Sequence, residues 1–344
     1  MGVQITELLS RKEINLNDLA NKIIAVDSHL FLYQFLTTIR QRDGSLLMDS
    51  KCRVTSHLAG LFTRSTKLME SGLKLVYVFD GEAPKLKHEE KERRAGLKIE
   101  AQKKYEEAAK KEDLEEMKKY AARTTRLTGE MIEEAKKLIS ALGLPIIEAP
   151  SEGEAQAAYL VKKGKAFAVA SQDADALLFG APILVRNLSV VGKQKKKKKI
   201  AYEIFKPEII ELAENLNKLG IDQNQLIVLG MLVGTDYDPR GIKGIGPKNA
   251  LKLLKQYKTN FDKLFKEVKW EDYFNFSWEE VFDLFKKIPV TDKFKLEWKD
   301  IDKEKVLKLL VDEHDFSEER VNRGVERLVK GKEKKLQKGL GDFF

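Results

Sequence analysis

The sequence predicts an α/β fold whose central sheet is mostly parallel and flanked by helices. Short apolar runs at 22–27, 74–80 and 166–175 each end in an aspartate. Amphipathic segments typical of helices lie between them, for example at 28–39 and 131–142. Strands that alternate with helices form parallel sheets, and ligands bind such sheets beyond the carboxyl ends of the strands. We therefore expect the acids at these ends to meet at one edge of the sheet.

The stretch 144–179 contributes four acids to this edge. Glu152 and Glu154 follow one apolar run, and Asp173 and Asp175 follow the next. Each pair also has a structural interpretation: Ser151 and Glu154 have the spacing of a helix-capping box, and the two aspartates are compatible with a turn. Recurrence favours a shared site, because further apolar runs also end in acids, namely Asp27, Asp80 and Asp236.

The composition fits one large domain or two ordinary ones with a polyanionic partner. The chain has 344 residues, of which 42% are hydrophobic and 34% charged, and its formal net charge is +9. Its single cysteine, Cys52, excludes an intrachain disulfide and a cysteine-based zinc site. The four histidines are scattered without metal-ligand spacing, so we expect them to be structural or surface residues.

Nothing in the sequence predicts a membrane protein, and we expect an intracellular location. No apolar run is long enough to span a bilayer, and the N-terminus lacks a signal-peptide core. Gly2 and Thr6 fit the loose myristoylation pattern, which we interpret as a chance match.

Residues 82–128 are dense in Lys, Arg, Glu and Ala and have few large apolar side chains. This composition favours helix but offers little apolar face to a core. The segment is either a solvated helical hairpin or an insertion that covers the acidic edge. It begins two residues after Asp80, which favours the insertion that covers the acidic edge. In that position Lys87, Arg93 and Arg94 would face a phosphate backbone.

Two later segments suit contacts with nucleic acid. A buried helix is expected from about residue 226 and ends near Asp236; the glycine-rich run 241–248 follows and contains Pro247. Glycines and a proline at a helix start expose backbone N–H groups, which bind phosphate without regard to base sequence. The lysine run 195–199 predicts an exposed hairpin loop, with DNA contact or targeting as secondary interpretations.

The convergent acids indicate a site for divalent cations. Like charges in one pocket repel and raise one another's pKa values. Hard oxygen ligands without histidine or cysteine indicate Mg²⁺ or Mn²⁺ rather than zinc, and two such ions are typical of phosphoryl chemistry. The seven candidate ligands are Asp27, Asp80, Glu152, Glu154, Asp173, Asp175 and Asp236. Which of them contact the ions directly is left open by the sequence.

Taken in order, the motifs resemble those of flap endonucleases of the archaeal and eukaryotic type, within the structure-specific 5′ nucleases. The resemblance covers essentially the whole chain and is carried by residues 1–4, 26–27, 33–36, 39–41, 78–81, 149–155, 172–175, 234–237, 241–248, 316–320 and the terminal Gln-x-x-Leu-x-x-Phe-Phe. It implies a Mg²⁺-dependent endonuclease that removes 5′ flaps at single-strand/double-strand junctions in lagging-strand maturation and repair. The absence of a long basic tail favours an archaeal member.

The resemblance also implies a division of the chain. The nuclease domain would cover 1–260, with an N-terminal part at 1–98 and an internal part at 116–260. A helical arch is expected at about 82–130 and a helix–two-turn–helix at about 226–258. A C-terminal helical part, 261–330, and a flexible tail, 331–344, would follow.

Further residues receive roles only through the resemblance. Lys87 and Arg94 match the arch residues directed at the scissile phosphate. Tyr33 would stack on a base, Arg40 would wedge the junction, and Gly2 would lie near bent DNA. The remaining assignments are Gly244, Gly246 and Lys248 for duplex grip with a K⁺ site, Arg320 for a one-nucleotide 3′ flap, and Gln337, Leu340, Phe343 and Phe344 for a sliding clamp.

The sequence leaves three alternative functions, each of which fits it less well. A sister nuclease for bubbles or Holliday junctions would differ in arch length and tail, and the compact arch favours flaps. A non-catalytic DNA-binding clamp adaptor would not need the seven acids. A PIN-type ribonuclease would share the strand-end acids but not the glycine-rich grip at 241–248. We expect a monomer that binds branched DNA and the clamp.

Overall fold

The computed structural model describes the chain except for residues 1, 112, 191, 196–201 and 342–344. Within this part the main sheet has seven strands in the order β1-β9-β6-β5-β2-β3-β4. The pairs from β6 to β4 are parallel, whereas β9 pairs antiparallel with both β6 and β1, so the predicted mostly parallel sheet is confirmed. The strands are β1 (Lys12–Glu13), β2 (Ile23–Asp27), β3 (Lys74–Phe79), β4 (Ile146–Glu148), β5 (Ala168–Ala170), β6 (Ile183–Arg186) and β9 (Glu208–Glu211).

Side-chain alternation along the strands builds a separate core on each face of the sheet. In β3, Leu75 and Tyr77 join one buried cluster, while Val76 and Val78 join the other. Successive side chains of a strand point to opposite faces, so a fully buried strand needs helices on both sides. The first face packs on α1 (Ser28–Thr38), α2 (Ser56–Glu70) and α5 (Gly129–Ala141). The second packs on α6 (Gly153–Lys162), α7 (Asp175–Leu178), α8 (Leu212–Leu219) and α9 (Gln223–Val233).

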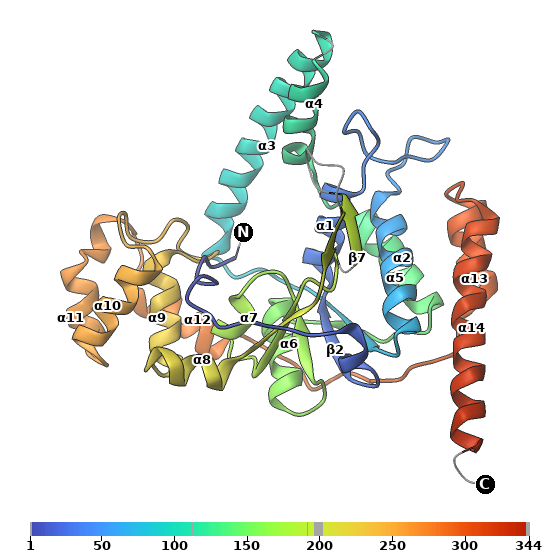
Figure 1. The fold of residues 1–344 in the computed structure, drawn as a ribbon. Helices are drawn as coiled ribbons and strands as arrows, with labels where there is room; N and C mark the ends of the chain where they lie inside the picture. The colour runs from blue at the N-terminus through green and yellow to red at the C-terminus, as the bar shows by residue number, and fades with distance from the viewer. Residues whose placement is uncertain (1, 112, 191, 196–201, 342–344) are drawn as a thin grey trace.

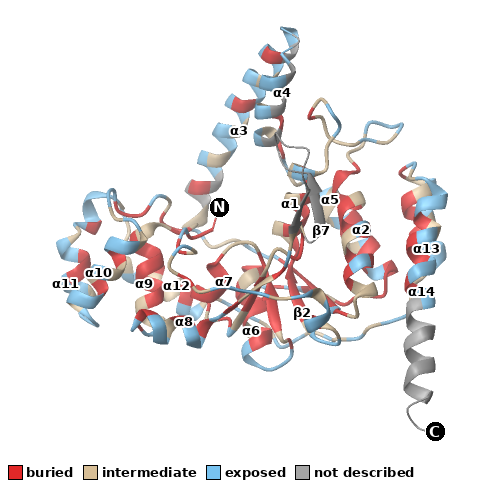
Figure 2. Ribbon diagram, in the orientation of Figure 1, coloured by how far each residue is buried: buried red, intermediate tan, exposed pale blue. Residues whose placement is uncertain are grey.

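Helices α3 (Lys87–Lys110) and α4 (Leu114–Ala121) project from the body as an arch (Figure 1). The arch is largely exposed (Figure 2), although Ala101 and Ala108 of α3 are buried. The expectation of a helical segment with little apolar face therefore agrees with the structure. A short 3₁₀ turn, η2 (Ala122–Thr124), leads back to the body.

The helices that follow α9 pack against both faces of the sheet. Helices α10 (Pro247–Tyr257), α11 (Phe261–Glu267) and α12 (Trp278–Lys287), with the 3₁₀ turn η3 (Trp270–Asp272), join the core that contains α9. The segment 288–302 then crosses to the other face without helix; Trp298 donates its indole N–H to the Leu75 carbonyl at 2.9 Å. There α13 (Lys303–Leu307), the π-helical turn η4 (Lys308–Asp312) and α14 (Glu318–Gly341) join the core of α2 and α5.

A helical backbone extends into the predicted tail, 331–344, as far as the structure describes it. Helix α14 continues to Gly341, and residues 342–344 lie outside the described part. The physical reason is composition, because the Lys, Glu, Leu and Gln residues of 332–340 favour helix. Strands β7 (Gly192–Lys195) and β8 (Tyr202–Phe205) pair antiparallel. The exposed loop expected at the lysine run falls on residues 196–199, which lie outside the described part of the chain.

Two smaller features complete the fold. The 3₁₀ turn η1 (Leu16–Leu19) follows β1, and its Leu19 is buried in the core of α1 and α2. In the described part of the chain, no helix is both long and apolar enough to cross a membrane.

Candidate active site

The carboxyl ends of neighbouring strands deliver acids to one edge of the sheet. Asp27 is the last residue of β2, and Asp80 directly follows β3. Because β5, β2, β3 and β4 lie side by side and run parallel, the acids that follow them gather at the same edge. Asp27 also begins helix α1, since its Oδ1 accepts the Leu30 N–H at 3.1 Å.

Hydrogen bonds from Ser171 and Gly153 connect acids that come from different parts of the chain. The Ser171 hydroxyl lies 3.1 Å from Glu154 Oε1 and 3.4 Å from Asp27 Oδ2. The Gly153 N–H donates to Asp80 Oδ1 at 2.7 Å, and a Cβ on Gly153 would lie 2.7 Å from that oxygen. A glycine is therefore needed where α6 approaches Asp80.

The N-terminal residues reach into the same site. The Gly2 N–H donates to Asp173 Oδ2 at 2.9 Å, and the Val3 N–H donates to Asp175 Oδ1 at 2.6 Å. These two bonds fix both aspartates that follow β5. Asp175 is the first residue of α7, so it is a helix-start residue rather than part of a simple turn.

Burial and mutual repulsion raise the pKa values of these acids. Burial, followed by the charge of Asp80, raises the pKa of Asp27 to about 8. Burial and the charge of Asp236 raise the pKa of Asp175 to about 7. Burial and the neighbouring aspartates hold the pKa of Glu154 well above its usual range. Such a site gains free energy from a cation that neutralises the carboxylates.

Two cations from the arch already face this site. Lys87 Nζ lies 2.7 Å from Glu152 Oε2 and 3.4 Å from Asp236 Oδ2. Arg94 Nη2 lies 2.6 Å from Asp236 Oδ1. Burial opposes the charged form of Asp236, but Lys87 and Arg94 outweigh it and lower the pKa of this carboxyl. The same carboxylates raise the pKa of Lys87 against the effect of its own burial, so Lys87 stays charged.

The structure thus brings together all seven predicted acids and both predicted arch residues. Electrostatic coupling links the acids pairwise, as for Glu152 with Asp80 and Asp236. Among the described residues, no group of three or more potential ligands already has the spacing of a formed metal site. The donor set nevertheless fits a hard divalent cation, because it consists of carboxylates without a thiol, and burial raises the pKa values of Asp27, Glu154 and Asp175.

The capping box expected at Ser151 and Glu154 is wrong. The N-cap of α6 is Glu152, which makes no side-chain capping bond. The Ser151 hydroxyl instead donates to the Glu82 carbonyl at 3.0 Å, because the loop after β3 runs alongside residues 150–151. Glu154 turns toward Ser171, so both members of the predicted box are used elsewhere.

Sequence reasoning missed two residues of the site. His29 Nδ1 accepts the Asp80 N–H at 3.1 Å and lies 3.3 Å from Asp80 Oδ2. The sequence predicts only a structural or surface role for His29. Its position two residues after Asp27 is the one sequence feature that places it near the site. Ser171 was missed because its role depends on two acids from different elements.

The residues expected to bind DNA surround the site at varying distances. Tyr33 of α1 faces the arch, where Lys98 Nζ lies 5.4 Å from its ring centroid. Arg40 donates to the Gly44 carbonyl at 2.8 Å and contacts the Thr125 hydroxyl, so it connects a loop to the base of the arch.

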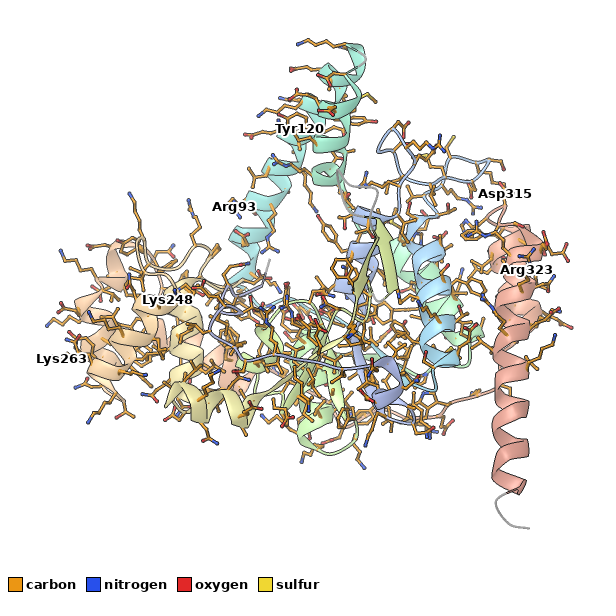
Figure 3. The ribbon with its side chains drawn as sticks, in the orientation of Figure 1. Arg93, Tyr120, Lys248, Lys263, Asp315 and Arg323 are labelled. Carbon is orange, nitrogen blue, oxygen red and sulfur yellow. The ribbon has the colours of Figure 1, made fainter. Side chains whose placement is uncertain are left out.

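The glycine-rich run forms an open helix start. Gly246 is the N-cap of α10, with Pro247 in its first turn and no side-chain cap. Gly244 has a positive φ of 84°, which favours glycine. Lys248, in the first turn of α10, is exposed (Figure 3). Uncapped N–H groups at this helix start are free to meet an anion.

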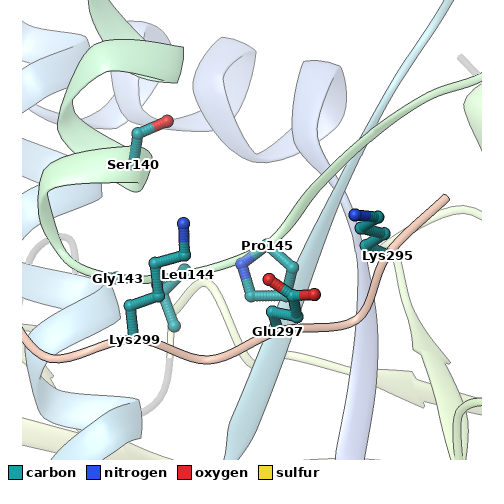
Figure 4. A pocket seen from close by; sticks show the side chains of 7 residues that line it. All are labelled: Ser140, Gly143, Leu144, Pro145, Lys295, Glu297 and Lys299. Carbon is teal, nitrogen blue, oxygen red and sulfur yellow. The ribbon is translucent and has the colours of Figure 1, made fainter.

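Two cavities lie outside the acidic cluster. One of about 760 Å³ lies between α2 and α14 and is lined by Phe316, Ser317 and Arg320 among others. A second, of about 190 Å³, lies where the segment 288–302 passes α5, between Lys295, Lys299 and Ser140 (Figure 4). The Arg320 expected at a flap pocket therefore lines the larger cavity.

Comparisons with known proteins agree with this geometry. The XPG N-terminal domain matches residues 1–101, and the XPG I-region matches residues 143–236. Flap endonuclease 1 of Thermococcus onnurineus is 51% identical over 100% of this chain and 99% of its own length. The chain belongs to the flap endonuclease family. Flap endonuclease 1 of Pyrococcus furiosus, at 52% identity and the same coverage, supports the assignment.

Solved structures extend the family match to the fold. Flap endonuclease-1 from Methanococcus jannaschii superimposes with a TM-score of 0.76 at 43% identity, over 97% of this chain and 100% of the other. The catalytic core of Rad2 in complex with DNA substrate gives 0.68 at 25% identity, over 94% and 97%. Flap endonucleases are hydrolases of DNA phosphodiesters, and nucleases of this kind generally depend on a divalent metal.

Proposed function

We propose that this chain is a 5′ flap endonuclease that hydrolyses DNA at single-strand/double-strand junctions with two Mg²⁺ ions, in Okazaki fragment maturation and DNA repair. The observation that carries the proposal is the contact between Lys87 and Arg94 of the arch and the buried acids at the sheet edge. A site that combines buried carboxylates with cations on a projecting helix suits a phosphodiester held between metal ions and side chains.

The acids that would hold the ions are those whose charge is least compensated by the protein. Asp27 and Asp175 are buried, Glu154 is partly buried, and the pKa values of all three are raised. Mg²⁺ is the expected ion, and Mn²⁺ has the same preference for oxygen. When bound, the ions would supply a water of lowered pKa and offset charge on the phosphate. Asp80, Glu152, Asp173 and Asp236 complete the proposed ligand set.

The arch residues act on the phosphate itself. Lys87 and Arg94 lie within ion-pair distance of Glu152 and Asp236, so a phosphate in the site would lie close to both cations. A fixed positive charge aimed at a phosphoryl oxygen stabilises the charge that develops there during hydrolysis. Because neither group has to lose its proton, their contribution is electrostatic rather than acid–base.

The surrounding surface would hold the DNA without reading its sequence. The open start of α10, with Gly244, Gly246 and Lys248, suits the duplex backbone, and a K⁺ ion at this turn is part of the proposal. Tyr33 would stack on a base beside the site, and Gly2 would lie near the bend. Arg40 would separate the strands, and Arg320 would receive a 3′ flap in the 760 Å³ cavity.

The C-terminus would bind a sliding clamp. Gln337 and Leu340 belong to the last turns of α14, whereas Phe343 and Phe344 lie outside the described residues. Terminal aromatic residues are stabilised when a partner removes them from water. Binding would bring this nuclease to the junctions that a moving clamp leaves behind.

A substrate panel tests the proposed function. Double-flap, bubble, Holliday-junction and RNA substrates are each incubated with the full chain in Mg²⁺ and in EDTA. We expect cleavage of the double flap in Mg²⁺ to be fastest and all cleavage to stop in EDTA. Faster cleavage of bubbles or junctions, or cleavage that persists in EDTA, would contradict the proposal.

A further inference from the structure

Glu90 stands out on the arch because it is a buried carboxylate on a mostly exposed helix. It lies in the first turn of α3 and is only 3% exposed, whereas Glu92, two residues on, is exposed. A carboxylate is rarely removed from water unless hydrogen-bonding partners replace its solvation. The proposed mechanism gives Glu90 no role, so its burial needs another explanation.

Two neighbouring arginines provide the partners of Glu90. Arg93 approaches with two nitrogens, Nε at 2.6 Å from Oε2 and Nη2 at 2.7 Å from Oε1. Arg94 donates from Nε to Oε1 at 2.6 Å. Glu90 therefore accepts one hydrogen bond from Nε of Arg94 and two from Nε and Nη2 of Arg93. Arg93 is labelled in Figure 3.

The contact with Glu90 determines which way Arg94 points. With its Nε held by Glu90, the planar guanidinium extends Nη2 to Asp236 Oδ1 at 2.6 Å. A guanidinium is rigid, so fixing one nitrogen restricts the directions of the other two. Among the described ion pairs, Arg94 and not Arg93 reaches Asp236, which separates the roles of two adjacent and chemically identical residues.

Charge balance gives Glu90 a second effect on Arg94. Arg93 and Arg94 are adjacent cations that repel each other, and Glu90 lies between them. Without the carboxylate, Arg94 would lose an acceptor and retain the repulsion. Its side chain would then sample other rotamers and spend less time at the acidic site.

We propose that Glu90 is a positioning residue that holds the Arg94 guanidinium at the acidic site and thereby supports phosphodiester hydrolysis. Glu90 acts through Arg94 and does not itself contact the reacting phosphate. The inference rests on the proposed function, and specifically on the action of Arg94 on the phosphate. A purely structural role would be different: the ion pairs would stabilise the helix and leave turnover unchanged.

A double-mutant cycle separates the two roles. Glu90→Gln keeps the size of the side chain and removes its charge, Arg94→Ala removes the proposed target, and the third protein carries both changes. Glu92→Gln is the matched control, since Glu92 is an exposed glutamate on the same helix. The kcat and KM for a double-flap substrate in Mg²⁺ are measured for each, together with thermal unfolding.

Glu90→Gln is expected to lower kcat about tenfold with little change in KM, because an interaction made in the transition state is weakened. In the Arg94→Ala background the same change should alter kcat less than about twofold, since residues that act as a unit are not additive. Glu92→Gln should match the unchanged protein. Equal effects of Glu90→Gln in both backgrounds, or an unchanged kcat with a lowered Tm, would overturn the inference.

A second variant keeps the proposal testable if Glu90→Gln does not fold. Arg94→Lys preserves the positive charge but lacks the fork of donors that Glu90 holds, so it should lower kcat about as much as Glu90→Gln. Full activity of Arg94→Lys would show that the grip on the guanidinium is unnecessary. If the unchanged protein cleaves no flap, the proposed function itself is rejected. If the unchanged protein is active and Glu90→Gln has the same kcat, only the role of Glu90 is rejected.

Discussion

At the residue scale, the acids of the sheet edge combine function with a cost in stability. Asp27 begins α1 through its bond to the Leu30 N–H, yet its burial and the charge of Asp80 raise its pKa to about 8. A bound metal ion requires the charged form of Asp27, and this form destabilises the metal-free protein. This conflict is typical of sites that are built for a cation.

Asp27→Asn is expected to stabilise the metal-free protein and to abolish cleavage. Asparagine caps a helix about as well as aspartate, so the main change is the loss of a buried charge. In EDTA at pH 9 the free energy of unfolding should rise by on the order of 1–3 kcal/mol. Chemical unfolding measures this gain, and a variant no more stable than the unchanged protein would contradict the account.

The pH dependence of this gain follows from the direction of the shift. The folded pKa of Asp27, about 8, lies above the ordinary value of 3.8 for an aspartate. The destabilisation is therefore complete above the folded pKa and is relieved as the pH falls toward the unfolded value. The difference between Asp27→Asn and the unchanged protein should accordingly shrink between pH 9 and pH 5.

The strand-end acids were predictable from the sequence, whereas their partners were not. Asp27 and Asp80 follow apolar runs, which is a local pattern. The bond from the Asp80 N–H to His29 spans 51 positions, and the contact between Ser171 and Asp27 spans 144. Such partners depend on how the strands are ordered in the sheet, which no local pattern contains.

At the element scale, the arch and the helices beneath it serve different purposes. Helix α3 carries Lys87, Glu90 and Arg94 on its first two turns, directly after the loop that follows β3. Its exposed surface needs no core, which explains why the sequence there shows no apolar period. Helices α2, α5 and α14 instead have apolar faces, which pack in the core on one face of the sheet.

Lys87→Ala should lower kcat far more than DNA affinity. Its ammonium lies 2.7 Å from Glu152 and is one of two cations at the site. Removal of one electrostatic group that acts in the transition state costs about 10²–10³ in kcat. Single-turnover cleavage and equilibrium binding distinguish the two effects, with Lys85→Ala as an exposed control; a pure loss of binding would argue against a role in hydrolysis.

A buried polar network joins α2, α5 and the segment before α14. Glu134 Oε2 lies 3.1 Å from His57 Nε2, and its Oε1 lies 3.2 Å from His314 Nε2. The His314 Nδ1 in turn lies 3.2 Å from Asp49 Oδ2. These residues lie beside the 760 Å³ cavity, which His314 lines.

Glu134→Ala is expected to destabilise the fold by about 2–4 kcal/mol, because it leaves buried histidine nitrogens without partners. Glu133→Ala is the matched control, since Glu133 is 64% exposed and pairs only at the surface with Lys136. Its effect should stay within about 1 kcal/mol. Urea unfolding measures both, and equal stabilities of the two variants would refute the importance of the network.

At the scale of the whole molecule, the acidic site lies between two sets of candidate DNA contacts. Helix α10 lies on one side of the arch base, and helices α2 and α14 lie on the other (Figure 1). The 760 Å³ cavity lies between α2 and α14. A branched DNA that spans both sides would place its junction at the arch. The net charge of +9 favours such a polyanion and predicts binding that weakens with salt.

The sequence predicted the sheet and the arch, but not the path of the C-terminal region. The strands have short apolar runs that end in acids, and α3 has a helix-favouring composition. The segment 288–302 has neither such an apolar run nor a helical backbone. Its crossing from one face of the sheet to the other is shown only by the structure, where the Trp298 indole N–H donates to the Leu75 carbonyl of β3. Antiparallel β9 was missed for a similar reason, since its register depends on β6.

The tail makes a separate prediction about the assembly. Changing Phe343 and Phe344 together to alanine should remove stimulation by a sliding clamp and leave intrinsic flap cleavage unchanged. The reason is that the proposed hydrolysis uses the acids and the arch cations, whereas aromatic residues at a chain end suit burial by a partner. Cleavage rates with and without clamp measure the effect, and undiminished stimulation would refute the role of the tail.

The central claim is that the buried acids hold metal ions for hydrolysis of a flap, and Asp173→Ala tests it most directly. Asp173 lies at the site, where it accepts the Gly2 N–H at 2.9 Å. We predict that this variant binds double-flap DNA nearly as well as the unchanged protein but no longer cleaves it in Mg²⁺. Near-normal turnover by Asp173→Ala in Mg²⁺ would contradict the account.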